Sequence, residues 1–142
     1  MKSILWFRIS AVLLFLYGSG HTFRFLLASP ETPEGRSAWF SMRKAHLTRD
    51  KSSSTFADFY RGFGIYVAAL FFLESFLAWH CSHVVGEYID DAIVLGWSIL
   101  LLQILGVILS WRYFGIVQVV LSVITGTSVG IALALVTPIH TF

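Results

Sequence analysis

Four long apolar stretches, separated by short connections, constrain the fold of this chain more than any other feature. Each is long enough for a helix, rising about 1.5 Å per residue, to cross the roughly 30 Å hydrocarbon core of a bilayer. Charged residues make up only 13% of the sequence and apolar residues 56%, outside the range of soluble globular domains. We predict a polytopic, all-α membrane protein that forms one domain, a four-transmembrane-helix bundle over residues 1–142. The expected spans are residues 4–28, 62–83, 92–111 and 113–137.

The first connection, residues 29–61, carries most of the charge and is predicted to contain a short helix. Thr32 followed by Pro33 is typical of an N-cap with proline at the first helical position. Aromatic side chains mixed with basic groups favour an amphipathic helix lying at the membrane interface. Its amphipathicity is imperfect, because Arg43 falls on the same helical face as Trp39.

The start of the second long helix is predicted by Thr55 and Asp58, which are three residues apart. This spacing has the form of a capping box, in which each residue satisfies a backbone N–H group of the other. Aspartate here replaces the more usual glutamate or glutamine.

The distribution of lysine and arginine predicts the orientation, because basic residues gather on the cytoplasmic side of a membrane protein. The second connection, residues 87–91, has three carboxylates and no base. We expect both termini outside and residues 29–61 in the cytoplasm. Membrane lipid is the expected partner of these basic residues, and no nucleic-acid role is predicted. The basic side holds Arg24, Arg36, Arg43, Lys44, Arg49, Lys51, Arg61 and Arg112, whereas the other side holds Lys2 and Arg8.

Glu74 lies in the middle of the second apolar stretch, where an isolated charge is costly. Counting about 1.5 Å per residue from the basic side places Glu74 and Thr125 roughly 18 Å deep, with Gln103 within about a turn of that level. Unpartnered polar groups are expensive in hydrocarbon, so we expect these three side chains to face one another, with Glu74 protonated. This layer is the expected ligand-binding site, together with Gln118 and Arg24 nearer the basic face. Each residue also has a structural explanation as an interhelical hydrogen-bonding group.

Glu74 and His21 are the candidate catalytic residues if the protein is an enzyme. A glutamate and a histidine could act as acid and base on an apolar substrate. The two side chains lie about two helical turns apart in depth, so contact requires water or a tilted helix. Small neighbours around His21 equally favour a structural role, in which the imidazole bonds a group of the second helix.

A metal site is a weaker alternative near the end of the second helix. His80, His83 and Glu87 are spaced to share one helical face, but Gly86 interrupts the helix and the spacing matches no closed zinc signature. Cys81 is the single cysteine, which excludes an intramolecular disulfide. We predict no cofactor.

The last apolar stretch carries a stripe of small residues at every fourth position. Such a stripe lets another helix approach closely. Packing within the chain is the favoured explanation, and a homo-oligomer or another membrane protein is the alternative. The stripe consists of Ser122, Gly126, Gly130 and Ala134.

Two short motifs carry a resemblance to a known family. They are Gly-His-Thr at residues 20–22 and Asp-Phe-Tyr-Arg-Gly-Phe-Gly at residues 58–64. With the charged connection between them, they resemble a family of small four-helix bacterial integral membrane proteins that has no established activity. The resemblance is strongest over about a third of the chain. It implies a four-helix fold in the bacterial cytoplasmic (inner) membrane and brings no catalytic residue. Its motif positions here are His21, Asp58, Tyr60 and Gly64.

Three functions are compatible with these patterns. The favoured one is a non-enzymatic accessory subunit or a binder of a lipid-like ligand, because the sequence has no paired nucleophile and base. The second is a membrane enzyme in which Glu74 and His21 act as acid and base. The third is proton or ion passage through an oligomer, along the midplane polar layer. An apolar pocket open to lipid, with Glu74 and His21 both on its wall, would favour an enzyme or a ligand-binding protein. Tight packing of Glu74 against Gln103 or Thr125 would weaken both of these functions.

Overall fold

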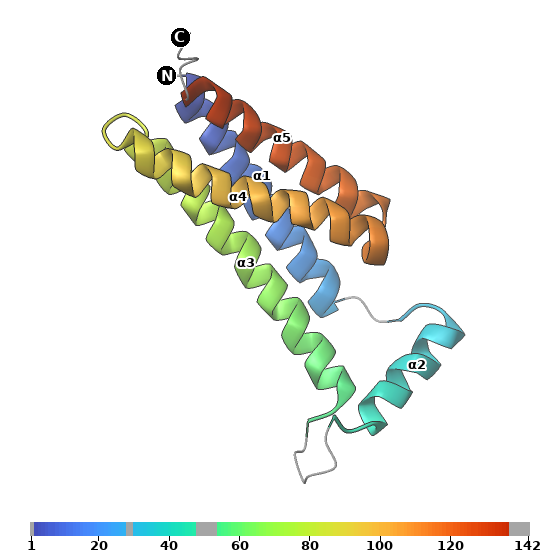
Figure 1. The fold of residues 1–142 in the computed structure, drawn as a ribbon. Helices are drawn as coiled ribbons and strands as arrows, with labels where there is room; N and C mark the ends of the chain where they lie inside the picture. The colour runs from blue at the N-terminus through green and yellow to red at the C-terminus, as the bar shows by residue number, and fades with distance from the viewer. Residues whose placement is uncertain (1, 28–29, 48–53, 137–142) are drawn as a thin grey trace. The chain divides into compact units, whose positions relative to one another are not determined.

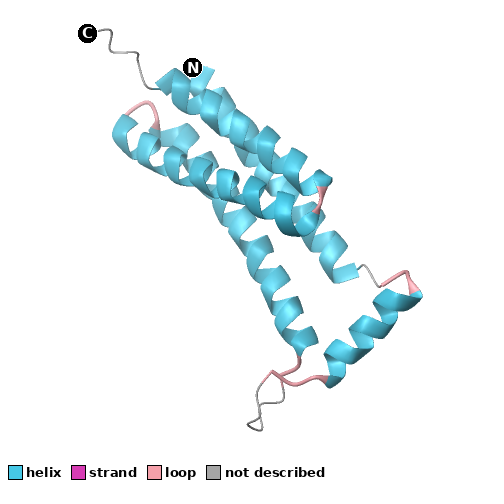
Figure 2. Ribbon diagram, turned by 45° about the vertical axis from the view of Figure 1, so that its right-hand side comes forward, coloured by secondary structure: helices cyan, strands magenta, loops and turns pink. Residues whose placement is uncertain are grey.

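The fold is entirely helical in the residues that the computed structural model describes, which are 2–27, 30–47 and 54–136. They form five α-helices and one π-helical turn, with no strand among them (Figure 1, Figure 2). Four of the helices, α1, α3, α4 and α5, are long and apolar enough to cross a membrane, which confirms this part of the prediction. The elements are α1 (Lys2–Leu27), α2 (Pro33–Lys44), α3 (Phe56–Val84), α4 (Ile89–Leu109), η1 (Ser110–Phe114) and α5 (Ile116–Val136).

Local hydrogen bonds at the predicted caps start α2 and α3. The Thr32 hydroxyl accepts from the backbone N–H of Gly35 at 3.0 Å. Asp58 accepts from the backbone N–H of Thr55 at 2.9 Å, and the Thr55 hydroxyl accepts from that of Asp58 at 3.2 Å. Both predicted helix starts are confirmed.

The starts of α3, α4 and α5 differ from the starts of the apolar stretches that predicted them. α5 begins at Ile116 rather than residue 113, because η1 and Gly115 separate it from α4. α3 begins at Phe56 rather than residue 62, and α4 begins at Ile89 rather than residue 92. Hydropathy marks the part of a helix that suits hydrocarbon, whereas capping and charge set its end. Asp90 and Asp91, in the first turn of α4, are favourable at a helix N-terminus. Residues 28 and 137, which end two of the predicted spans, lie outside the described residues.

The chain divides into two compact units. Unit 1 comprises the described parts of Met1–Tyr17 and Phe71–Phe142, and unit 2 comprises those of Gly18–Leu70. α1 and α3 therefore each contribute one segment to unit 1 and one to unit 2. Unit 1 also contains α4, η1 and α5, and unit 2 also contains α2.

In unit 1, α4 and α5 form an antiparallel hairpin (Figure 1, Figure 2). Glycines lie at two of the contacts between these helices. A Cβ added at Gly96 would lie 2.7 Å from Leu133 Cδ2, and one added at Gly106 would lie 3.2 Å from the Ser122 hydroxyl. The absence of a side chain at Gly96 thus lets the two helices pack closely. The core of this unit includes the fully buried side chains Phe7, Leu14, Ile99 and Val129.

In unit 2, the motif residues of α1 and α3 contact one another. The His21 Nε2–H group donates to the carbonyl oxygen of Gly64 at 3.3 Å. A side chain at Gly64 would collide with the ring of Phe25, which lies 5.1 Å from the Tyr60 ring. Close packing therefore accounts for glycine at position 64.

Candidate functional site

Glu74 and Gln103 form a buried hydrogen-bonded pair in unit 1. Glu74 on α3 is 6% exposed and Gln103 on α4 is 2% exposed. The amide Nε2 of Gln103 donates to Glu74 Oε2 at 2.5 Å. The structure therefore brings together two of the three polar residues that depth counting grouped at the midplane.

The amide oxygen of Gln103 favours a protonated Glu74. Gln103 Oε1 is buried and has no hydrogen-bond partner among the described residues. An ionised carboxylate only accepts hydrogen bonds, whereas a carboxylic acid carries one O–H donor. A protonated Glu74 can donate to the amide oxygen while it accepts from the amide nitrogen. Both polar atoms of Gln103 would then be satisfied.

The other predicted members of the polar layer have different surroundings. Thr125 is buried, but its hydroxyl donates to the carbonyl of Leu121 on its own helix at 2.9 Å rather than to Glu74. Gln118 is half-buried, and its backbone carbonyl accepts from the Tyr17 hydroxyl at 3.5 Å. Arg24 is exposed and belongs to unit 2. The five predicted ligand-binding residues thus do not form one cluster in unit 1.

His21 has a structural position in unit 2. Its bond to Gly64 joins α1 to α3, and its ring stacks on Phe25 with a centroid distance of 5.8 Å. Glu74 belongs to unit 1, so the two candidate catalytic residues lie in different units.

The histidines near the end of α3 lie against aromatic rings. His80 stacks on Phe76 with centroids 6.4 Å apart, and His83 lies 5.6 Å from Trp79. Glu87, the third candidate metal ligand, is exposed. No group of three metal-ligating side chains suited to an ion occurs within the described ranges.

The small-residue stripe of α5 is divided between packed and open positions. A Cβ at Gly126 would lie 3.3 Å from Gln103 Cβ, and Ser122 lies against Gly106. A Cβ added at Gly130 would have no heavy atom of the described residues within 4 Å. Ala134 is exposed. The first half of the stripe therefore supports packing of α5 against α4.

An apolar groove runs between α1 and α3 in unit 1, with a volume of about 390 Å³. Among the described residues, Ser75 is the one lining residue with a hydroxyl, and this hydroxyl is occupied because it donates to the Ala11 carbonyl at 2.8 Å. Phe15 and Phe72 contact each other at one position along the groove, with centroids 5.5 Å apart. The lining residues are Ala11, Val12 and Phe15 of α1, with Phe72, Ser75, Phe76 and Trp79 of α3.

A cationic side chain lies at the Trp79 end of this groove. The Arg8 guanidinium carbon is 5.5 Å from the Trp79 ring centroid, within range of a cation–π interaction. Arg8 is exposed and precedes Val12 and Phe15 on one face of α1. The groove therefore combines an apolar wall with a positive charge at one end.

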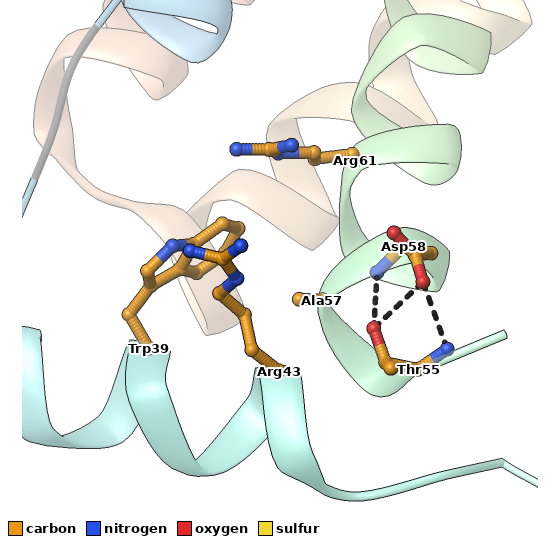
Figure 3. Close-up of a pocket in the computed structure, with 6 residues that line it drawn as sticks. All are labelled: Trp39, Arg43, Thr55, Ala57, Asp58 and Arg61. Atoms are coloured by element: carbon orange, nitrogen blue, oxygen red, sulfur yellow. Dashed lines mark hydrogen bonds between the residues drawn. The ribbon is translucent and has the colours of Figure 1, made fainter. Parts of the chain in front are cut away.

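Unit 2 contains a second, more polar pocket of about 200 Å³ between α2 and the start of α3. The Arg61 guanidinium carbon is 5.2 Å from the Trp39 ring centroid, and the guanidinium groups of Arg43 and Arg61 both extend toward Trp39 (Figure 3). The Asp58 carboxylate instead bonds Thr55, so it is held within its own capping box (Figure 3). Ala57 completes the lining.

Sequence patterns contained signals for both cavities that the prediction did not use. In the sequence, Arg43 interrupts the aromatic face of α2 and makes the helix less amphipathic. In the structure, Arg43 lines the pocket together with Trp39. In unit 1, Arg8 and the groove residues of α1 recur at helical spacing. Neither pattern shows which face of which other helix it meets.

Comparison of the chain with protein-family models, with curated proteins and with solved structures finds no match.

Proposed function

We propose that this protein is a non-enzymatic membrane protein that holds an acyl chain of an anionic phospholipid in the groove between α1 and α3. In this proposal α1, α3, α4 and α5 cross a bacterial cytoplasmic membrane as a bundle and α2 lies at its interface. Both termini are outside, and residues 29–61 face the cytoplasm. The observation that carries the proposal is the groove, which is apolar along its length and has Arg8 at one end.

The dimensions and chemistry of the groove suit a lipid chain. Its volume of about 390 Å³ lies within the usual range of ligand sites, roughly 300–1,000 Å³. Lipid tails are as apolar as the groove wall, so moving a chain from bilayer to groove brings no hydrophobic gain. Retention must come from dispersion contacts with the aromatic rings and from the headgroup.

Arg8 supplies the headgroup contact in this proposal. The planar Arg8 guanidinium can donate charge-assisted hydrogen bonds to the phosphate oxygens of a headgroup. Trp79 holds the Arg8 guanidinium close to the groove by a cation–π contact. The expected ligand therefore has an anionic headgroup above a hydrocarbon chain.

The position of Glu74 supports binding over catalysis. An acid or base acts on a substrate only if it reaches the cavity that holds it. Of the residues that the structure describes, seven line the groove, and Glu74 is not among them although Ser75 is. Glu74 is instead packed against Gln103, and both residues serve to join α3 to α4.

Filling the groove tests the proposal. Val12 lines the groove and is 53% exposed, so Val12→Trp places an indole in the groove without replacing a core residue. Val94→Trp is the matched control, because Val94 is 65% exposed on α4 and does not line the groove. The protein is purified in mild detergent, and the phospholipid retained per chain is counted by native mass spectrometry.

We expect the wild type and Val94→Trp to retain a phospholipid and Val12→Trp to lose it. Equal retention by both variants, or a wild type that holds no lipid, would contradict the proposal.

A further inference from the structure

The pocket of unit 2 brings two arginines from different helices to one tryptophan. Arg43 follows Trp39 by one turn on α2, and Arg61 lies in the second turn of α3. Guanidinium groups present several donors in a planar fork that matches the oxygens of phosphate. The Trp39 ring restrains the Arg61 guanidinium, which reduces the freedom that Arg61 would lose on binding a ligand.

The charge of the pocket favours an anion. Arg43 and Arg61 contribute two positive charges, and Asp58 contributes the one negative charge among the lining residues. The Asp58 carboxylate already accepts from the Thr55 hydroxyl at 2.7 Å and from the Thr55 backbone N–H at 2.9 Å. It is therefore held by the helix cap, and Arg43 and Arg61 line the same pocket.

The volume suits a small anion. The cavity of about 200 Å³ corresponds to roughly six or seven waters at about 30 Å³ each, which is enough for a phosphate group and the carbons esterified to it.

The length of α3 places this pocket at headgroup level. Its 29 residues span about 43 Å at about 1.5 Å per residue, whereas the hydrocarbon core is about 30 Å thick. If α3 crosses the membrane along its normal, roughly 13 Å of the helix lies outside hydrocarbon. The capped first turns, with Asp58 and Arg61, carry the charge that suits the headgroup layer.

We infer that Trp39, Arg43 and Arg61 form a binding site for one phosphate group, carried either by an anionic phospholipid headgroup or by a small soluble phosphate ester. This inference stands on unit 2 alone and does not rest on the groove of unit 1. Loss of the groove proposal would leave it unchanged.

Paired charge-neutralising variants test the site. Arg43→Gln with Arg61→Gln removes both pocket guanidinium groups. Arg36→Gln with Lys44→Gln removes the same net charge from exposed positions of α2 that do not line the pocket. All four side chains are exposed, so neither double variant disturbs the core. Arg43→Lys with Arg61→Lys keeps the charge but removes the planar fork.

One arm of the experiment tests the lipid source. Each protein in this arm also carries Val12→Trp, which fills the groove of unit 1, so that lipid in the groove is not counted. The proteins are reconstituted in nanodiscs of equal parts phosphatidylglycerol and phosphatidylcholine, and retained phosphatidylglycerol is counted by native mass spectrometry. The second arm tests the soluble source, by titrating lipid-free micellar protein with inorganic phosphate and with glycerol 3-phosphate in a calorimeter.

If the phosphate belongs to a lipid, the pocket variant retains roughly tenfold less phosphatidylglycerol than the α2 control, and the lysine variant is intermediate. If it belongs to a soluble ester, the wild type binds phosphate or glycerol 3-phosphate, and the pocket variant loses that binding. Either result supports the site. Equal lipid retention by the two glutamine variants, together with no phosphate binding by the wild type, would overturn it.

Discussion

Gln103→Leu and Glu74→Leu, made singly and together, measure what the buried pair contributes to the packing of α3 against α4. Gln103→Leu removes the amide that donates to Glu74 and leaves a carboxyl that is only 6% exposed without that donor. Glu74→Leu leaves the Gln103 amide, which is 2% exposed, without its acceptor. The double variant replaces both polar groups by apolar ones.

The expected magnitudes follow from this burial. A buried polar group that loses its partner costs about 1–3 kcal/mol, whereas replacing both partners by apolar groups can be nearly neutral. Interhelical hydrogen bonds in membranes show coupling energies of about 0.6 kcal/mol on average and about 1.7 kcal/mol at most. We therefore expect each single variant to lose about 1–3 kcal/mol, and the double variant to lose less than the sum by about 0.6–1.7 kcal/mol.

The assay is reversible unfolding in mixed micelles titrated with dodecyl sulfate, followed by circular dichroism. Ser98→Ala is the control, because the exposed Ser98 hydroxyl bonds only the Val94 carbonyl of its own helix among the described residues, at 2.9 Å. This control should change the free energy of unfolding by less than about 0.5 kcal/mol. Strictly additive effects of the two leucine substitutions would refute the assignment of Glu74 as a structural partner of Gln103.

Two further predictions concern the same unit. Gly96→Ala should lower the free energy of unfolding by about 1–3 kcal/mol, because its Cβ would lie 2.7 Å from Leu133 Cδ2. A Cβ at Gly130 would meet no heavy atom of the described chain within 4 Å, so Gly130→Ala should leave the free energy of unfolding unchanged or raise it by up to about 1 kcal/mol in the same titration. Equal losses of this free energy in both alanine variants would contradict the packing of the hairpin. Infrared spectra at neutral pH should contain a carboxylic-acid C=O band that disappears in Glu74→Gln, and its absence from the wild type would show that Glu74 is ionised.

Sequence alone predicted the helices and some of their contacts for clear physical reasons. Four apolar stretches of about 20 residues have few alternatives to a membrane-crossing helix. The Thr32 cap and the Thr55 capping box are local hydrogen-bond patterns, so they can be recognised without knowledge of the tertiary fold. Depth counting paired Glu74 with Gln103 because helices that cross one membrane share a common depth scale.

The same counting did not predict that the Thr125 hydroxyl bonds within its own helix rather than to Glu74, because depth does not specify rotation about a helix axis. A threonine hydroxyl in a helix can also satisfy itself by donating to the carbonyl four residues earlier, as Thr125 does to Leu121. No pattern of polarity could predict this bond, since α5 is apolar on most of its surface.

The two cavities could not be derived from the sequence for a related reason. A helix that is apolar around its whole circumference has no polar stripe to show which face packs and which stays open, so the groove residues of α1 and α3 look like any other lipid-facing residues. The pocket of unit 2 needs Arg61 of α3 beside Trp39 of α2, and this contact exists only in the folded chain.

Photocrosslinking with a phospholipid that carries a diazirine in its acyl chain tests the binding proposal most directly. The protein is reconstituted with this lipid and irradiated, and the labelled residues are identified by peptide mass spectrometry. Labelling should concentrate on the groove, at residues 11–15 and 72–79, and should fall in Val12→Trp. Exposed apolar residues of α4 outside the groove, such as Val94 and Leu101, should be labelled less. Labels spread over all four long helices in proportion to their exposure would contradict a dedicated lipid site.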